Sequence, residues 1–133
     1  MLTIIRTICT VTRTIQQDSN KHFKDLKLNR NLFIYIIRIC EQPGMFLSQV
    51  ADTIQIDRTT SFRTIKKLTQ EGYFELRDDG DNHKIKRLFP TQKALDLYPQ
   101  LNAYEQSQSD FLLSDLSEKE KQQLALLLSK LKY

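Results

Sequence analysis

The stretch that decides the fold is IDRTTSFRTIKKL at residues 56–68. Its apolar residues Phe62, Ile65 and Leu68 recur at the spacing of one helical face, and they are predicted to point inward. Asp57 precedes them at the position of an N-terminal helix cap. This stretch therefore predicts a short amphipathic helix whose other face is polar and basic.

The next stretch, EGYFELRDDGDNHKIKRLFP at residues 71–90, changes to a β pattern. Residues 73–77 and 84–89 are predicted as two strands, because β-branched and aromatic residues alternate with polar ones. The polar, glycine-containing run at 78–82 is predicted as the turn between them, and Pro90 as the end of the second strand. A hairpin directly after a helix of this kind is the position of the wing in a winged helix.

A second short helix is predicted just before the first, over residues 46–54. Val50, Ala51 and Ile54 form its inward face, and a break at 55–56 separates it from Asp57. Two short helices joined by a few residues form a helix-turn-helix pattern.

Longer helices flank this region. Residues 29–41 are apolar over more than half of their circumference, which predicts a central, buried helix that stops at Gln42-Pro43-Gly44. Residues 3–17 carry an apolar stripe but many threonines, so this helix is expected to depend on a partner surface. The stripe consists of Ile4, Ile5, Ile8, Val11 and Ile15.

The C-terminal part is also predicted to be helical. Residues 92–113 form a long helix that Thr91 is expected to cap and that Pro99 is expected to kink or break. The sequence from Ser117 to Glu120 fits a capping box for the last helix. The two apolar stripes consist of Leu95, Tyr98, Leu101, Tyr104 and Phe111, and of Leu124, Leu127, Leu128 and Leu131.

Composition indicates a globular protein of 133 residues, with 40% hydrophobic and 27% charged residues and a net charge of +4. The excess of Lys and Arg is confined to residues 1–93, whereas residues 94–133 are mildly acidic. No segment is apolar over the length of a membrane span, and Arg6 and Arg13 interrupt the N-terminal apolar run, unlike a signal peptide. We therefore expect no membrane partner and a cytoplasmic location.

The polar face of the helix at 57–71 is the predicted contact with double-stranded DNA. A helix can enter the major groove when one face packs on the protein and the other presents hydrogen-bond donors. Arginine can donate two bonds to guanine, and a basic hairpin can reach the adjacent backbone or minor groove. The predicted contacts are Arg58, Thr59, Thr60, Ser61, Arg63, Thr64 and Lys67 on the helix, and His83, Lys84 and Lys86 on the wing.

Other functions receive less support from the sequence. A protein-interaction module would be expected to have an acidic or apolar recognition face. An enzyme, a metal site or a bound cofactor is not expected, because paired carboxylates, a glycine-rich phosphate loop and metal-ligand spacings are absent. Cys9 and Cys40 lie among apolar residues at helical spacing, which favours buried side chains, with a redox-sensing thiol as the alternative.

The sequence resembles the MarR family of winged-helix regulators. The resemblance rests on Pro43-Gly44, SQVAD at 48–52, IDRTTSFRTIKKL at 56–68, EGYFELR at 71–77 and KIKRLFPTQKA at 84–94, in the order of the family.

The resemblance implies a fold that is mainly α with a small β-hairpin. A winged helix-turn-helix lobe at 29–91 would be joined to dimerisation helices at 1–28 and 92–133, all within one subunit of residues 1–133. It further implies a homodimer on a pseudo-palindromic operator, acting as a transcriptional repressor, with a small-molecule effector in some members.

Three positions depart from the family pattern. Phe46 stands where a Ser or Thr usually caps the first helix of the pair, so a phosphate contact is not expected there. Asn82-His83-Lys84 replaces the usual Asp-x-Arg of the wing, which predicts a looser wing. Phe62 is larger than the usual side chain, so a slight displacement of the recognition helix is expected.

Overall fold

The computed structural model describes residues 1–133, which form two compact units, residues 1–102 and 103–133. Six helices and three strands make up the chain, and the prediction of a mainly α fold with a small hairpin is confirmed. In chain order they are α1 (Leu2–His22), α2 (Leu32–Glu41), β1 (Met45–Phe46), α3 (Leu47–Ile54), α4 (Arg58–Gln70), β2 (Phe74–Asp79), β3 (Asn82–Pro90), α5 (Gln92–Leu112) and α6 (Glu118–Ser129).

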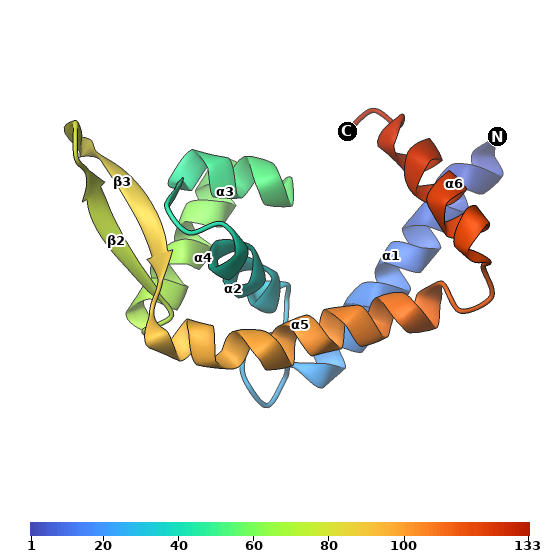
Figure 1. Ribbon diagram of the computed structural model, residues 1–133, viewed down its shortest axis with the longest axis horizontal. Coiled ribbons are helices and arrows are strands. Elements are labelled where there is room, and N and C mark those ends of the chain that lie inside the picture. The colour runs from blue at the N-terminus through green and yellow to red at the C-terminus, as the bar shows by residue number, and fades with distance from the viewer. The chain divides into compact units, whose positions relative to one another are not determined.

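Helix α2 lies at the centre of the first unit, as predicted. It contacts α3, α4 and β3, and Ile36, Ile37 and Ile39 on it are fully buried. Burial of each such side chain contributes about 1.5–3 kcal/mol, so α2 makes a large favourable contribution to the core of the first unit. Figure 1 shows α2, α3 and α4 clustered beside the β2–β3 hairpin.

Helices α3 and α4 form the predicted helix-turn-helix. Gln55 ends α3 in the left-handed region, at φ 60°, and thereby turns the chain toward α4. At the other end of α3, the backbone N–H of Phe46 donates to Gln49 Oε1 at 2.8 Å. This bond satisfies only the N–H of the capping residue, because Phe46 has no side-chain oxygen to accept from the N–H groups of the first turn.

Helix α4 ends in a turn that leads directly into the hairpin. Gly72 has φ +88°, a value that residues with a side chain rarely adopt. The N–H of Tyr73 donates to Leu68 O at 3.0 Å and the N–H of Gly72 to Thr69 O at 3.1 Å, which satisfies the last carbonyls of the helix. The turn therefore fixes where β2 leaves α4.

The sheet is antiparallel, with strand order β1-β3-β2. Leu88 of β3 is its buried centre, paired with Met45 on one side and Leu76 on the other. Strand β1 was not predicted, because two residues are too few to show an alternating pattern. The hairpin strands are longer than predicted: Asp79 pairs with Asn82, so the turn shrinks to Gly80 and Asp81.

Helix α1 continues past the predicted segment at 3–17 and ends at His22. The loop that follows is anchored by Phe23, which is buried and stacks on Phe33 with ring centroids 4.3 Å apart. The apolar stripe near the start of α1 is not covered, for Ile4 and Ile5 are 49% and 54% exposed. That a partner surface covers this helix stays a prediction.

Helix α5 runs without a break through Pro99, so the predicted break is absent. Thr91 donates its hydroxyl to the carbonyl oxygens of Gly72 and Tyr73, which ties the start of α5 to the end of α4. Within α5, Leu101 is fully buried whereas Phe111 is 83% exposed.

The second unit is held together differently from the first. The predicted capping box is confirmed, because Ser117 N–H donates to Glu120 Oε2 at 2.8 Å and Glu120 N–H donates to Ser117 Oγ at 3.3 Å. No residue of 103–133 is buried, and the leucine stripe of α6 remains open to solvent. The boundary between the two units lies inside α5, and the assignment of the terminal helices to a dimer interface stays a prediction.

Candidate DNA-binding surface

The start of α4 is fixed by Asp57, as predicted. Its Oδ2 accepts from the backbone N–H of Thr60 at 2.9 Å. This hydrogen bond, from the Thr60 backbone, holds the pKa of the Asp57 carboxyl below its ordinary value of 3.8. The cap is therefore charged at neutral pH, and it defines the end of the helix that carries the candidate surface.

The outward face of α4 carries four cations, all exposed, and none of them forms an ion pair. Unpaired cations on one helix face are available to an external anion such as a phosphate group. Thr59 and Thr60 are exposed beside them, near the helix start. The four cations are Arg58, Arg63, Lys66 and Lys67, of which Lys66 was not among the predicted contacts.

Ser61 corrects the prediction of the reading face. Its side chain is fully buried, together with Ile65 and Leu68, and its hydroxyl has no hydrogen-bond partner. A serine at this position cannot contact an external base without moving the helix. The expectation that Ser61 contacts DNA was therefore wrong.

The prediction for the neighbouring Phe62 was also wrong. It was predicted to point inward, but 40% of its side chain is exposed. Helical spacing allows the inward face to consist either of residues 61, 65 and 68 or of residues 62, 65 and 68. In the structure, the smaller residue, Ser61, packs in the tight contact. Phe62 therefore adds an aromatic ring to the edge of the outward face, which the sequence analysis did not foresee.

Thr64 is only partly exposed. Its hydroxyl donates to Thr60 O at 3.0 Å, a bond back along the helix. A side chain engaged in this way can still offer its methyl group or its oxygen lone pairs. Its predicted role in a DNA contact remains untested.

The predicted wing residues are all exposed on β3, but their electrostatic situations differ. Asp78 forms an ion pair with Lys86 and approaches His83 Nδ1 at 3.4 Å. The hydrogen bond from Lys86 holds the pKa of the Asp78 carboxyl below its ordinary range. Lys84 has no ion-pair partner; its backbone N–H donates to Asn82 Oδ1 at 3.0 Å. Lys84 is therefore the wing cation most available to a phosphate.

Arg87 is bound to an acid of the wing, which the acidic residues at 78, 79 and 81 allow, and also to the segment around β1. Its Nε donates to Asp79 Oδ1 at 2.9 Å, and its Nη1 donates to Gly44 O at 2.9 Å. The guanidinium also lies over the Phe46 ring, 4.2 Å from its centroid. An Asp–Arg pair, which this chain lacks at 82–84, is thus present between two other wing positions, Asp79 and Arg87.

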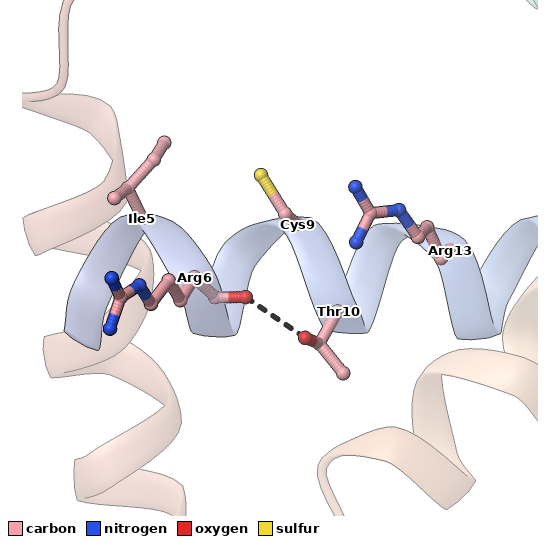
Figure 2. A pocket seen from close by; sticks show the side chains of 5 residues that line it. All are labelled: Ile5, Arg6, Cys9, Thr10 and Arg13. Carbon is pink, nitrogen blue, oxygen red and sulfur yellow. Dashed lines mark hydrogen bonds between the residues drawn. The ribbon is translucent and has the colours of Figure 1, made fainter. Parts of the chain in front are cut away.

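The two cysteines do not form a site of their own. Burial, with a smaller effect of Glu41, raises the pKa of the Cys40 thiol to about 11, so it is protonated at neutral pH and a poor redox sensor. Cys9 lines a hollow of about 430 Å³ on α1, shown in Figure 2, whose lining residues all come from that helix. They are Ile5, Arg6, Cys9, Thr10 and Arg13.

The structure contains neither a cluster of metal-binding side chains nor a helix that could span a membrane. No group of three or more His, Cys, Asp or Glu side chains is placed to hold a metal ion. None of the helices α1 to α6 combines the length and the apolar character that a membrane span requires.

No protein-family model matches the chain. Among curated proteins, it is 38% identical over 129 residues to the uncharacterized HTH-type transcriptional regulator YybA of Bacillus subtilis, which covers 97% of this chain and 86% of the relative. Among solved structures, it is similar to the transcriptional regulator SlyA, with 38% identity, a TM-score of 0.91, and 96% and 89% of the two chains covered.

A third similarity is to a MarR family transcriptional regulator of Listeria monocytogenes, solved in complex with a 26mer DNA. The identity is 36% and the TM-score 0.90, and 95% of this chain and 84% of that chain are covered. These proteins are regulators and not enzymes. A relative of this identity over nearly the whole chain, together with the winged helix-turn-helix that α3, α4 and the hairpin form, leads to one conclusion: the chain belongs to the MarR family of winged-helix transcriptional regulators.

Proposed function

We propose that this regulator binds double-stranded DNA in a sequence-specific manner as a homodimer and represses transcription by occupying its operator. The observation that carries the proposal is the outward face of α4, on which four exposed cations form no ion pair. Helix α4 contains no acidic residue, so these charges are not neutralised along the helix and are available to a polyanion.

In the proposed complex, α4 lies in the major groove with its N-terminal half toward the base edges. Arg58 and Arg63 are the candidate base readers, because a guanidinium can donate two parallel bonds to guanine O6 and N7. Lys66 and Lys67, farther along the helix, are suited to phosphates as point charges. Thr59 and Thr60, near the positive end of the helix, complete the contact with hydroxyl groups.

Phe62 gives the proposed surface an apolar element. An aromatic side chain on a recognition helix can contact the C5 methyl group of thymine, the one apolar group in the major groove. Its 40% exposure at the edge of a cationic face favours this role over a purely structural one. The expected operator therefore combines guanine with thymine.

The wing is proposed to contact the backbone or the minor groove beside α4. Lys84 is the principal candidate. Lys86 and His83 contribute less net charge, because Asp78 lies against both of them. The wing of this protein is thus expected to add less electrostatic attraction than its count of basic residues suggests.

A second copy of the chain is the proposed cover for the terminal helices. Leu124, Leu127 and Leu128 of α6 are 37%, 61% and 44% exposed, and Leu131, just after the end of the helix, is 45% exposed. An apolar stripe of this kind is expected to be buried by a partner. Two lobes related by a two-fold axis would meet half-sites about one DNA turn apart, roughly 34–36 Å. An effector would release DNA only by binding better to a lobe spacing that the operator does not fit.

The experiment is a salt-titrated anisotropy assay that compares Arg63→Ala with Lys24→Ala, which removes the same charge from an exposed loop. Wild-type chain is expected to bind random duplex at low salt and its selected operator more tightly. Arg63→Ala should weaken binding to the operator by about 1–3 kcal/mol more than it weakens binding to random duplex. Lys24→Ala should show no such difference between the two duplexes.

Two results would contradict the proposal. An equal loss on both duplexes would exclude Arg63 as a base reader. An absence of binding to any duplex at low salt would exclude DNA as the ligand and favour a protein partner.

A further inference from the structure

Arg87 joins the wing to the helix-turn-helix through three contacts of one guanidinium. Its Nε–Asp79 Oδ1 and Nη1–Gly44 O distances are both 2.9 Å, and its carbon Cζ lies 4.2 Å from the centroid of the Phe46 ring. We define Arg87, Asp79, Gly44 and Phe46 as the Arg87 cluster. Asp79 and Arg87 lie on the two strands of the hairpin, whereas Gly44 and Phe46 lie far from them in sequence, at β1.

The partners of Arg87 lie on both sides of a junction. Asp79 ends β2, beside the irregularity in pairing between Asp78 and Asp79, so it belongs to the distal half of the hairpin. Phe46 pairs with Arg87 in the sheet and is also the residue before the first turn of α3. A single side chain therefore connects the distal wing to the start of the helix-turn-helix.

Only arginine can make all three contacts at once. Two donors of its rigid, planar fork point to two different acceptors, while its flat face remains free to cover an aromatic ring. A lysine at this position retains one charge but has no fork and no flat face. The side chains of Arg87 and Asp79 are 38% and 20% exposed, so water screens this pair less than a fully exposed one.

The cluster also removes two charges from the surface that faces a polyanion. The Arg87 guanidinium is committed to partners inside the chain, in contrast to Lys84, which has none. Asp79 is neutralised by it, and an unpaired carboxylate at this point of the wing would repel phosphate. Arg87 is thus placed to act on DNA binding without touching DNA.

We propose that Arg87 is the residue that positions the wing: it fixes the distal hairpin against the start of the helix-turn-helix, so that the wing cations and α4 meet the same duplex. It takes over the ordering that an Asp-x-Arg sequence at 82–84 would supply. The effect on DNA rests on the proposed function, whereas the ordering of the wing is a property of the free protein.

The test is amide hydrogen exchange of the free full-length chain, with Arg87→Gln and Arg87→Lys compared with wild type. We expect both variants to exchange faster at residues 78–86 and at wild-type rates in α2, which shows that the fold is intact. Arg77→Gln is the matched control: Arg77 also stacks on an aromatic ring, Phe89, but its partners lie on β2 and β3 alone. We expect it to leave exchange at 78–86 near the wild-type rate.

The second measurement is DNA affinity. Arg87→Gln should weaken operator binding about three- to fivefold, as expected for loss of a partly exposed ion pair. The double variant Arg87→Gln with Asp79→Asn should recover part of this affinity, because the repelling carboxylate is gone, but it should keep the fast exchange.

The outcomes separate the two proposals. Unchanged exchange at 78–86 in Arg87→Gln overturns the positioning role, whatever the DNA affinity. Faster exchange in a chain that binds no DNA retains the positioning role and overturns the proposed function. Slow exchange at 78–86 in the double variant would also overturn the positioning role, because it would show that Arg87 only compensates the charge of Asp79.

Discussion

Ser61 shows how the interior of the lobe decides which residues of α4 remain for the ligand. Its side chain is fully buried in the tight contact of α4 with the lobe, and its hydroxyl has no partner. A buried polar group without a hydrogen bond costs free energy, because it gives up its bonds to water. The small size of Ser61, and not its hydroxyl, therefore suits this position. The neighbouring Phe62 lies on the outward face.

A substitution at Ser61 separates these two roles. Ser61→Ala is expected to raise the free energy of unfolding by about 1 kcal/mol, because an unpartnered buried hydroxyl is removed at nearly constant volume. Its operator affinity should equal that of wild type. Thr59→Ala, which removes an exposed hydroxyl from the same helix, should have little effect on stability and should weaken DNA binding. A lower melting temperature of Ser61→Ala, measured by thermal denaturation, would contradict this account.

At the scale of elements, the sequence predicted those parts that local chemistry determines. Asp57 before a polar turn, Gly72 after the last turn of α4, and the period change at Tyr73 each mark a boundary without reference to the rest of the chain. Strand β1 escaped prediction because it exists only through its pairing with β3. The prediction assigned Phe62 to the inward face of α4 in place of Ser61, because helical spacing alone does not distinguish these two residues.

The candidate site was predictable to a similar extent. The cations of α4 follow from sequence, because charged side chains are rarely buried. The wing was harder: its basic residues are evident, but which of them Asp78 and Asp79 engage depends on the register of the hairpin. The position of Arg87 over Phe46 was not predictable, because it depends on the pairing of β1 with β3.

The apolar part of the recognition helix gives a prediction about base identity. Replacement of single thymines in the selected operator by deoxyuridine removes only the C5 methyl group. We expect one thymine in each half-site whose replacement weakens wild-type binding about three- to fourfold, the effect of one buried methyl group. Phe62→Ala should be insensitive at that position.

The control for this prediction is Thr59→Ser, which removes a different exposed methyl group near the helix start and should retain the sensitivity. Anisotropy titrations of the modified duplexes give the result. An identical loss in wild type and Phe62→Ala would assign the methyl contact to another residue.

In the whole molecule, apolar side chains remain exposed at both ends of the chain. The start of α1 exposes Ile4 and Ile5, and residues 103–133 contain no buried side chain. A helix of the length of α6 is marginally stable in water by itself, so its leucines are expected to find a partner surface. The lobe, by contrast, has a complete core around α2. Dimerisation is therefore expected to stabilise the ends more than the lobe.

Leu127→Asp tests the proposed dimer. A charge in the centre of an apolar interface is costly, so this variant should sediment as a monomer at concentrations where wild type is a dimer. Its operator affinity should fall by about two orders of magnitude, because the two half-sites are no longer bound together. Gln122→Asp, on the opposite face of α6, should remain dimeric. A monomeric wild type, or a dimeric Leu127→Asp, in sedimentation equilibrium would contradict this assignment.

The central claim is that the outward face of α4 recognises a DNA sequence, and selection of duplexes from a random pool tests it most directly. We expect wild-type chain to enrich one motif of two inverted half-sites about one helical turn apart, and Arg63→Ala to lose the preference at one guanine in each half-site. Enrichment of no motif by the wild-type chain, or of an identical motif by both proteins, would contradict it.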